Sequence, residues 1–233
     1  IVATFQELVD KTKGKTFVNR DDTNSVRLDG KSIVQFDASV IDTLKLLMPG
    51  AFNRMNAAAA MTVGIEYGID EAVVRTSLES FSGIWRRFER VGVFNGAQII
   101  SDYGHHPTAV QGTLQGAREA FSTNRIVLLF EPHQHNRTKE LFSEFSESFG
   151  GADVLILSEI YGVLGRTEDR DAAVSSETLR IAAMKSEHPP KESYYAADLV
   201  DAESQLRTII QPGDVVIVMG AGDVDVVARN LVA

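Results

Sequence analysis

The 233-residue sequence contains no cysteine, so disulfide bonds and thiolate zinc sites are excluded. This composition fits a protein of the reducing cytoplasm. No run of about 18 consecutive apolar residues occurs, so we expect no membrane span. The opening residues, IVATFQELVD, have neither a basic segment nor a long apolar core, and they therefore do not form a signal peptide.

Positive charge is also scarce, because 23 Lys and Arg residues face 32 Asp and Glu residues and the formal net charge is −9. General binding of nucleic acid needs a basic surface, so we expect no nucleic-acid partner. A small anionic ligand is not excluded, since single loops can be basic on an acidic protein.

Apolar runs recur at regular spacing in the second part of the chain. Several are rich in β-branched residues and free of polar ones, as in strands buried on both faces. Helix-like stretches separate them, which predicts βαβ units and a parallel sheet. We therefore predict an α/β protein with a Rossmann-like domain over residues 89–233. The predicted strands are 97–101, 126–130, 154–157, 194–197 and 215–219, and the predicted helices are 108–121, 137–149, 175–185 and 199–210.

Residues 1–88 are less regular and are predicted to form a partial domain. Asp70 is expected to cap the last of its helices. Two or three short strands are expected between residues 26 and 48, and a break in the pattern places the domain boundary near residues 83–92. The other elements expected here are helices at 2–11, 53–67 and 71–81 and a strand at 16–19.

Four polar or glycine-rich segments each follow a predicted strand. Ligands bind at the carboxyl ends of the strands in open parallel sheets, so these segments are expected to form one binding edge. Four of the five histidines fall in two of the segments, which favours a function for them over a purely structural role. The segments are SDYGHHPT (101–108), EPHQHNRT (131–138), SEIYGVLGRTE (158–168) and MGAGDVD (219–225), and the histidines are His105, His106, His133 and His135.

The residue types at this edge favour an anion over a metal ion. His105 and His106 are adjacent, which rarely directs both side chains at one ion, and Arg137 would repel a cation. Pro107 suits the first turn of a helix, whose free N–H groups attract an anion, and a second helix is expected to start after Asn136. Arg137 adds a planar fork for phosphate or carboxylate, although by itself it could equally form a surface ion pair.

Three further features each allow two interpretations. MGAGDVD matches only the start of G-x-G-x-x-G, since Asp225 stands where the third Gly belongs, so a tight turn is favoured over dinucleotide binding. Asn53 and Asn56 share a helix face and could cap the helix or contact a base. Arg86 and Arg87 could be a solvated pair or could reach a ligand held between the domains.

The segments PGAFNRMNAAAA, WRRFERVG, SDYGHHPT, EPHQHNRT and MGAGD, in this order, resemble the motifs of the Mur ligases. D-Y-G-H-H-P-T with P-H-x-x-x-R-T is similar to the branch that adds L-alanine to UDP-N-acetylmuramate. The resemblance covers about residue 15 to the end and is strongest over 49–138. It implies that residues 1–88 belong to a central ATP-binding domain and residues 89–233 to the C-terminal domain.

The resemblance also implies a cytoplasmic ligase of peptidoglycan synthesis that uses ATP and Mg²⁺. Such an enzyme activates a carboxylate as an acyl phosphate, which the amine of L-alanine then attacks. It implies no metal ligand in this chain. The residues implied are Asn53, Asn56, Arg87 and Asp102 for ATP, Tyr103, His105, His106 and Arg137 for the muramoyl substrate, and His105 and Arg87 for catalysis.

The sequence departs from the family pattern at Phe52, Ser101 and Gln134, where His, Asp and Arg are usual. The change at Gln134 weakens the expected contact with the UDP-sugar. No G-x-x-x-x-G-K-[ST] occurs, so we expect the phosphate-binding loop, the Mg²⁺-binding carboxylate and the UDP-binding domain upstream of Ile1. The chain alone is therefore expected to bind ATP poorly and not to catalyse ligation.

Two other functions stay open. A ligase that recycles muramoyl peptides belongs to the same family, although D-Y-G-H-H-P rather than D-[FY]-A-H-H-P favours the alanine-adding branch. A non-catalytic binding module derived from the family is the second alternative, and the missing phosphate-binding loop supports it. A metal-dependent hydrolase is a more distant third.

Overall fold

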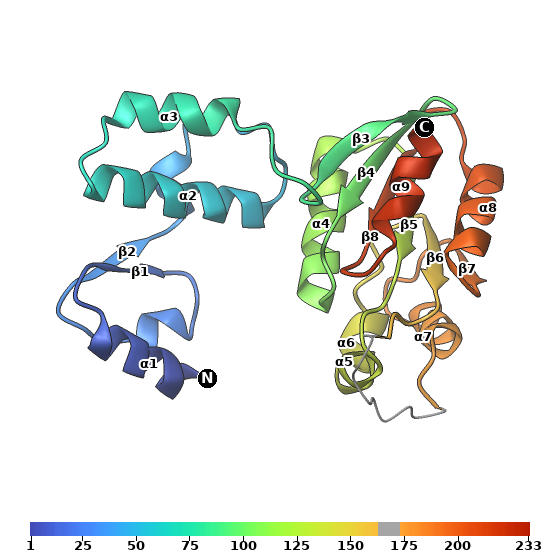
Figure 1. Ribbon diagram of the computed structural model, residues 1–233, viewed down its shortest axis with the longest axis horizontal. Helices are drawn as coiled ribbons and strands as arrows, with labels where there is room; N and C mark the ends of the chain where they lie inside the picture. The colour runs from blue at the N-terminus through green and yellow to red at the C-terminus, as the bar shows by residue number, and fades with distance from the viewer. Residues whose placement is uncertain (163–172) are drawn as a thin grey trace. The chain divides into compact units, whose positions relative to one another are not determined.

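The computed structural model describes residues 1–162 and 173–233, which divide into two compact units. The first unit runs from Ile1 to Ser82 and the second from Gly83 to Ala233. Figure 1 shows both as ribbons coloured along the chain. Each unit has a cluster of buried apolar side chains of its own.

The first unit combines helices with a small parallel sheet. β1 (Thr16–Asn19) pairs in parallel with β2 (Ile33–Phe36). The expectation of two or three strands between residues 26 and 48 is wrong, because β2 is the one strand that forms there. The side chain of Asp37 accepts a hydrogen bond from the N–H of Ser39, which favours a tight turn over a further strand. The helical elements are α1 (Val2–Lys11), η1 (Ser25–Arg27), η2 (Ala38–Ile41), α2 (Ala51–Glu66) and α3 (Glu71–Ser80).

Helix α2 packs closely against α3 because small residues line one of its faces. A Cβ added at Gly64 would come within 2.9 Å of the Val74 side chain on α3. Asp70 caps α3 as predicted, since its side chain accepts a hydrogen bond of 2.9 Å from the N–H of Ala72. The core cluster of this unit consists of the buried residues Ile41, Leu44, Ala57, Ala58, Met61 and Val74.

The second unit is built on a sheet whose strand order, over the described residues, is β3-β4-β8-β5-β6-β7. All neighbouring strands are parallel except the first two, which confirms the predicted α/β class and mainly parallel sheet. The third, fourth and sixth strands in chain order are buried along their whole length, as predicted for strands covered on both faces. The strands are β3 (Glu89–Phe94), β4 (Ala97–Asp102), β5 (Ile126–Phe130), β6 (Val154–Ser158), β7 (Glu192–Ala196) and β8 (Val215–Met219).

The edge strand β3 was not predicted from the sequence. It forms a hairpin with β4 through Asn95 and Gly96, which have φ angles of 48° and 76°. A two-residue turn with positive φ matches the twist of a hairpin, and Asn-Gly is a favoured pair for it. This dipeptide was therefore the feature that could have revealed β3. The strand was missed because it alternates between exposed and half-buried side chains and contains no continuous apolar run.

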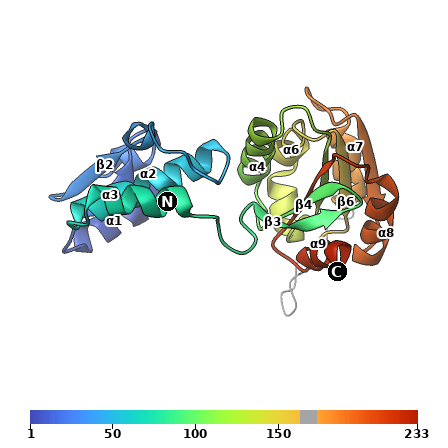
Figure 2. The same ribbon diagram turned by 90° about the horizontal axis from the view of Figure 1, so that it is seen from above.

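Helices cover both faces of this sheet. They are α4 (Pro107–Ala120), α5 (His135–Glu140), α6 (Phe142–Ser146), α7 (Ser176–Ala183), α8 (Leu199–Ile209) and α9 (Asp225–Val232). Figure 2 shows α4, α6 and α7 on one side of the sheet and α8 and α9 on the other. The predicted single helix over 137–149 is wrong, because Leu141 (φ −113°, ψ 24°) departs from helical geometry and separates α5 from α6. The final helix α9 was not predicted.

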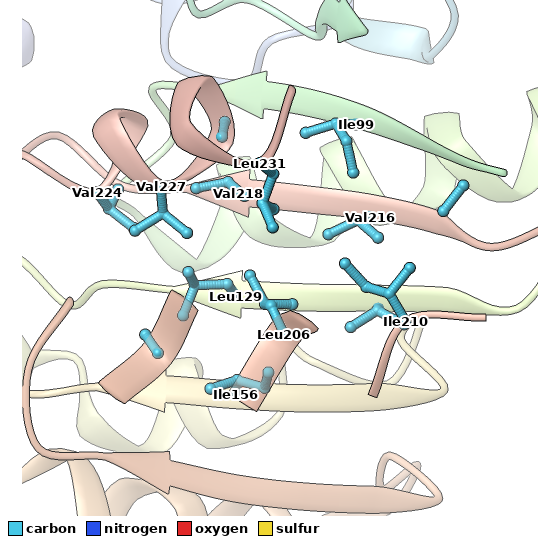
Figure 3. Close-up of a cluster of buried hydrophobic side chains, with 14 of the residues drawn as sticks. Ile99, Leu129, Ile156, Leu206, Ile210, Val216, Val218, Val224, Val227 and Leu231 are labelled. Carbon is cyan, nitrogen blue, oxygen red and sulfur yellow. The ribbon is translucent and has the colours of Figure 1, made fainter. Parts of the chain in front are cut away.

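The core beneath α8 and α9 is made from alternate residues of the strands (Figure 3). Ile99, Leu129 and Val218 point to this face and are fully buried. Leu206 on α8 and Leu231 on α9 pack against them. Burial of each such side chain stabilises the fold by roughly 1.5–3 kcal/mol, so this layer holds the ends of the strands in fixed positions. Across residues 1–162 and 173–233, no helix has the length and apolar character that crossing a bilayer requires.

Candidate functional site

The carboxyl ends of β4, β5 and β8 lie side by side, as predicted. Asp102 and Phe130 each lie opposite Met219 in the two ladders that flank β8. The N–H of Gly220 donates to the carbonyl of Asp102 at 3.1 Å, and the N–H of Glu131 donates to the carbonyl of Met219 at 2.9 Å. The segments that follow these strands are therefore neighbours in space.

A row of four rings crosses this edge. The rings of Tyr103 and His105 meet edge to face with centroids 5.5 Å apart, and His105 lies 6.0 Å from His133. His133 stacks on Tyr161, which follows β6, at 5.3 Å. We call Tyr103, His105, His133 and Tyr161 the ring row. The structure thus joins Tyr103 and His105, predicted as site residues, to His133, for which the sequence favoured a function without a specific role, and to Tyr161, which the prediction did not single out. The position of Tyr161 directly after a strand could have indicated it.

Backbone hydrogen bonds hold Tyr161, the last residue of the ring row, beside the segment that follows β5. The N–H of Gln134 donates to the carbonyl of Tyr161 at 3.0 Å, and the N–H of Tyr161 donates to the carbonyl of Pro132 at 2.8 Å. Gln134 has φ 72°, which is sparsely populated for a residue with a side chain. The predicted helix start after Asn136 is wrong, because α5 already begins at His135 and places Asn136 inside its first turn.

Three arginines surround the ring row. The guanidinium carbons of Arg86 and Arg87 lie 4.8 Å and 5.6 Å from the centre of the Tyr103 ring. Nη1 of Arg137 lies 3.5 Å from Nδ1 of His133. Arg86 is buried, whereas Arg87 is exposed and Arg137 is half-buried. Exposed guanidinium groups bind phosphate and carboxylate, so this arrangement favours an anionic ligand.

Asp102 is buried at the end of β4, and its carboxyl group binds the turn that precedes β3. Its Oδ1 accepts a hydrogen bond from the N–H of Gly104 at 2.7 Å, and its Oδ2 accepts one from the N–H of Phe88 at 2.9 Å. Burial raises the pKa of Asp102, while these N–H groups and the nearby Arg87 and Arg86 oppose the rise. The bond to Phe88 holds the backbone directly after Arg87 against the end of β4.

His105 and His106 have different surroundings although they are adjacent. Nδ1 of His105 lies 3.0 Å from the carbonyl of Tyr103. A carbonyl can only accept, so Nδ1 carries the proton in this contact and Nε2 is the acceptor nitrogen of the neutral ring. His106 is the N-cap of α4, where its Nδ1 accepts from the N–H of Thr108 at 3.4 Å, and Pro107 occupies the first turn as predicted.

Ser101, which replaces the usual Asp, has a structural explanation. Its hydroxyl donates to Oδ1 of Asp225 on α9 at 2.5 Å. Arg229 binds both Asp225 at 3.2 Å and Glu89 at 2.6 Å. A carboxylate at position 101 would face Asp225 in a buried setting, where two like charges repel strongly. This chain therefore uses a hydroxyl to join β4 to α9.

Glu131 is a buried acid that the sequence analysis did not single out. It directly follows β5, and only 3% of its surface is exposed. Burial raises the pKa of Glu131 to about 7. A Cβ added at Gly222 would come within 2.2 Å of its Oε2, so the MGAGD segment lies directly on the carboxyl group. This close approach favours the tight-turn interpretation of MGAGD, and the position of Glu131 after an apolar strand could have indicated it.

Asn53 and Asn56 lie on α2, in the first unit. Nδ2 of Asn53 donates to the carbonyl of Pro49 at 2.7 Å, so its amide stabilises the start of the helix. Asn56 is exposed. The ring row belongs to the second unit, and the contact of these amides with adenine stays a prediction.

Comparisons with known proteins point to the family that the motifs resemble. Residues 86–222 match the family model described as "Mur ligase, glutamate ligase domain". A UDP-N-acetylmuramate–L-alanine ligase of Sorangium cellulosum is 40% identical over 188 residues, which cover 80% of this chain and 39% of that protein. A ligase of the same name from Anaeromyxobacter dehalogenans is 38% identical over 213 residues, covering 90% of this chain and 45% of the relative.

A solved structure gives the same result for the fold. The crystal structure of UDP-N-acetylmuramate-alanine ligase from Thermotoga maritima matches with a TM-score of 0.66 and 27% identity, covering 81% of this chain and 39% of that one. The chain thus spans less than half the length of these relatives. The family match includes the ring row, the arginines beside it and the MGAGD segment up to Gly222. Because that match covers more than half of the sequence, the chain belongs to the Mur ligase family.

Proposed function

We propose that this chain supplies one side of the active site of an ATP-dependent ligase that joins L-alanine to UDP-N-acetylmuramate. The observation that carries the proposal is the ring row flanked by Arg87 and Arg137 at the carboxyl edge of the sheet. Relatives at 34–40% identity bear the name of this ligase, which supports the choice of substrates. Such a reaction belongs to peptidoglycan synthesis, and its use of ATP fits a cytoplasmic location.

The proposed chemistry activates the muramoyl carboxylate as an acyl phosphate and then replaces phosphate by the amine of alanine. Arg87 is proposed to bind the phosphates of ATP, since its guanidinium is exposed beside Tyr103. Arg137, Tyr103 and His106 are proposed to face the muramoyl substrate. His105 is proposed to take the proton that the alanine ammonium must lose before attack, because its Nε2 is the accepting nitrogen.

Asn53, Asn56 and Asp102 are proposed contacts of the nucleotide. Each oxygen of Asp102 accepts one backbone N–H, and a carboxylate oxygen has a second lone pair that a ribose hydroxyl can use. The exposed amide of Asn56 can pair with a base edge. The amide of Asn53 already donates to Pro49, so we expect Asn56 to contribute more to ATP binding.

The carboxylates around the ring row are poorly suited to Mg²⁺. Within the two described ranges, no group of three or more His, Asp or Glu side chains could hold a metal ion. Asp102 and Glu131 are both buried. Mg²⁺ needs several accessible oxygens, so we assign it no ligand among these described carboxylates and derive no step through it.

Gly104 favours the alanine-adding reaction over the recycling of muramoyl peptides. A Cβ added at Gly104 would lie 2.0 Å from Cε of the flexible Met219 side chain, 2.9 Å from Oδ1 of Asp102 and 3.2 Å from the Cβ of Ala109. The motif of the recycling branch has Ala at this position. In this chain an alanine at position 104 would crowd the carboxyl group of Asp102, which binds the backbone of the same loop.

The proposal is tested with a chimera in which this chain follows the upstream part of the Sorangium cellulosum relative. With UDP-N-acetylmuramate, ATP and L-alanine, the chimera is expected to release phosphate and form the alanyl product, and the chain alone is not. Product formed only when a preformed peptide with a free N-terminal amine replaces L-alanine would support the recycling alternative. A folded chimera that forms no product with either amine would contradict the proposal and favour a binding module.

His105→Gln sharpens the test. Removing a general base is expected to lower kcat/KM of the chimera by about 10²–10⁴-fold without lowering its Tm. His188→Gln is the matched control, because His188 is an exposed histidine outside the strand-end segments. Equal losses in the two variants would contradict the role of His105.

A further inference from the structure

Glu131 and Arg86 are a buried acidic and a buried basic side chain whose polar atoms are incompletely paired. Oε2 of Glu131 and Nε of Arg86 are buried and have no hydrogen-bond partner. Only 3% of Glu131 and 6% of Arg86 is exposed. Buried polar atoms are nearly always paired, so an orphaned acceptor and an orphaned donor beside the same loop require an explanation.

Arg86 links the ring row to the loop after β8. Its Nη2 donates to the carbonyls of Gly220 and Gly222, the latter at 3.0 Å. Its guanidinium carbon lies 4.8 Å from the Tyr103 ring and 5.3 Å from the Trp85 ring. The present position of Arg86 therefore depends on two loop carbonyls, and any movement of this side chain also alters the surroundings of Tyr103 and Trp85.

Glu131 lies beneath the same loop. A Cβ added at Gly220 would lie 3.1 Å from the Cβ of Glu131, and one added at Gly222 would lie 2.2 Å from its Oε2 and 2.7 Å from the Tyr161 ring. The carboxyl group is therefore enclosed by the loop. Two charged groups act on it, Asp223 from the loop after β8 and Arg86 from the turn before β3.

We infer that Glu131 is a positioning residue that controls Arg86 through its own proton. As a neutral acid, Glu131 leaves Arg86 on the carbonyls of Gly220 and Gly222. As a carboxylate, it attracts the guanidinium of Arg86, which then leaves those carbonyls and the face of Tyr103. The step transfers one proton between Glu131 and solvent and breaks no covalent bond.

Both states are accessible near neutral pH. Burial and the charge of Asp223 raise the pKa of Glu131, the N–H of Val224 and the charge of Arg86 oppose the rise, and the net pKa is about 7. Imidazole groups titrate in the same range, and His105 and His133 lie in the ring row. A test must therefore separate Glu131 from these histidines.

Trp85 provides the readout, since it is the one tryptophan in the sequence and lies beside Arg86. Fluorescence of the 233-residue chain is measured between pH 5 and pH 9. The wild-type chain is expected to show a transition with a midpoint near pH 7, and Glu131→Gln is expected to abolish it. Glu119→Gln makes the same chemical change at an exposed position on α4 and is expected to keep the transition. A transition that survives Glu131→Gln, or a wild-type chain without one, would overturn the inference.

A second measurement needs no variant. In the NMR spectrum of the wild-type chain, the Nε–H of Arg86 and the amides of Gly220 and Gly222 are expected to shift together with a midpoint near pH 7. Signals that stay constant across this range, or that shift with different midpoints, would contradict the inference even if Glu131→Gln failed to fold.

The consequence for catalysis rests on the proposed function and is tested separately. In the active chimera, kcat/KM is expected to fall above pH 7 as Arg86 leaves Tyr103, and Glu131→Gln is expected to remove that fall while retaining activity. A chimera without ligase activity would contradict the proposed function, and the fluorescence and NMR results would still decide the inference.

Discussion

The two units differ in how completely their secondary structure is covered by their own core. In the second unit, helices cover both faces of the sheet, and the cluster against α8 and α9 alone contains 16 buried residues. In the first unit, the sheet has two parallel strands and the core cluster has six buried residues. Parallel strands are normally buried on both faces, and a two-stranded pair is marginal by itself. In this protein, the unit with clear sequence periodicity is also the unit whose own core covers its sheet.

Separating the units tests this comparison and has the largest expected effect. Residues 83–233 alone are expected to unfold in one cooperative thermal transition, because their core lies within that range. Residues 1–82 alone are expected to show no cooperative transition, because a core cluster of six buried residues supplies little apolar burial. Circular dichroism on heating checks both pieces. A cooperative transition in residues 1–82 would show that the first unit also has a core sufficient for folding by itself.

Shortening a side chain at the centre of the larger core is expected to have the next largest effect, on the stability of the second unit. Leu129 is fully buried in β5, so Leu129→Ala is expected to reduce the free energy of unfolding of the second unit by about 2–5 kcal/mol. Val200→Ala is the control, because Val200 is 79% exposed and its truncation is expected to change stability by less than about 0.5 kcal/mol. Urea unfolding measures both variants, and similar losses would show that the core is not the main source of stability.

The pH dependence of stability is the smallest of the three effects. Burial acts to raise the pKa of Asp153, but Lys191, the N–H of Ile126 and Arg118 outweigh burial and lower the pKa to about 2. A lowered pKa in the folded state means that Asp153 stabilises the fold above about pH 4, and that this contribution is lost as the pH falls through about 2. We expect a contribution of about 1–2 kcal/mol.

Asp153→Asn measures this contribution. The variant is expected to be less stable than the wild type at pH 6 and to approach it in urea unfolding as the pH falls toward 2. An equal difference at both pH values would show that the lost stability comes from packing rather than from the charge. In the first unit, hydrogen bonds from Ser25 and Ser39 lower the pKa values of Asp22 and Asp37, so a loss of stability in acid is expected there as well.

Sequence reasoning succeeded where periodicity was strong. The runs at 126–130 and 215–219 predicted β5 and β8 to the residue, and Asp70 was predicted as a cap because its short side chain can accept from the helix start. The sequence-based prediction failed where local turn chemistry or tertiary packing determined the secondary structure. The hairpin strand β3 depended on Asn95 and Gly96, and the break between α5 and α6 had no marker in the pattern that was used.

The candidate site shows the same division. The strand-end segments followed from periodicity, so Tyr103, His105 and Arg137 could be placed at one edge. The ring contacts of these residues could not be predicted, because Tyr161 lies beside His133 only through the pairing of β5 with β6. Residue type also did not show that Asp102 holds a backbone turn through Phe88.

The α/β class, the position of the binding edge and the resemblance to the Mur ligases can be inferred from the amino-acid sequence, because these depend on the order of apolar runs and on motifs within single segments. The ring row, the burial of Glu131 and the contact of Arg86 with Gly220 and Gly222 arise from the tertiary fold. Those features join residues from distant parts of the chain, and a sheet order of β4-β8-β5-β6 brings them together in a way that no local pattern encodes.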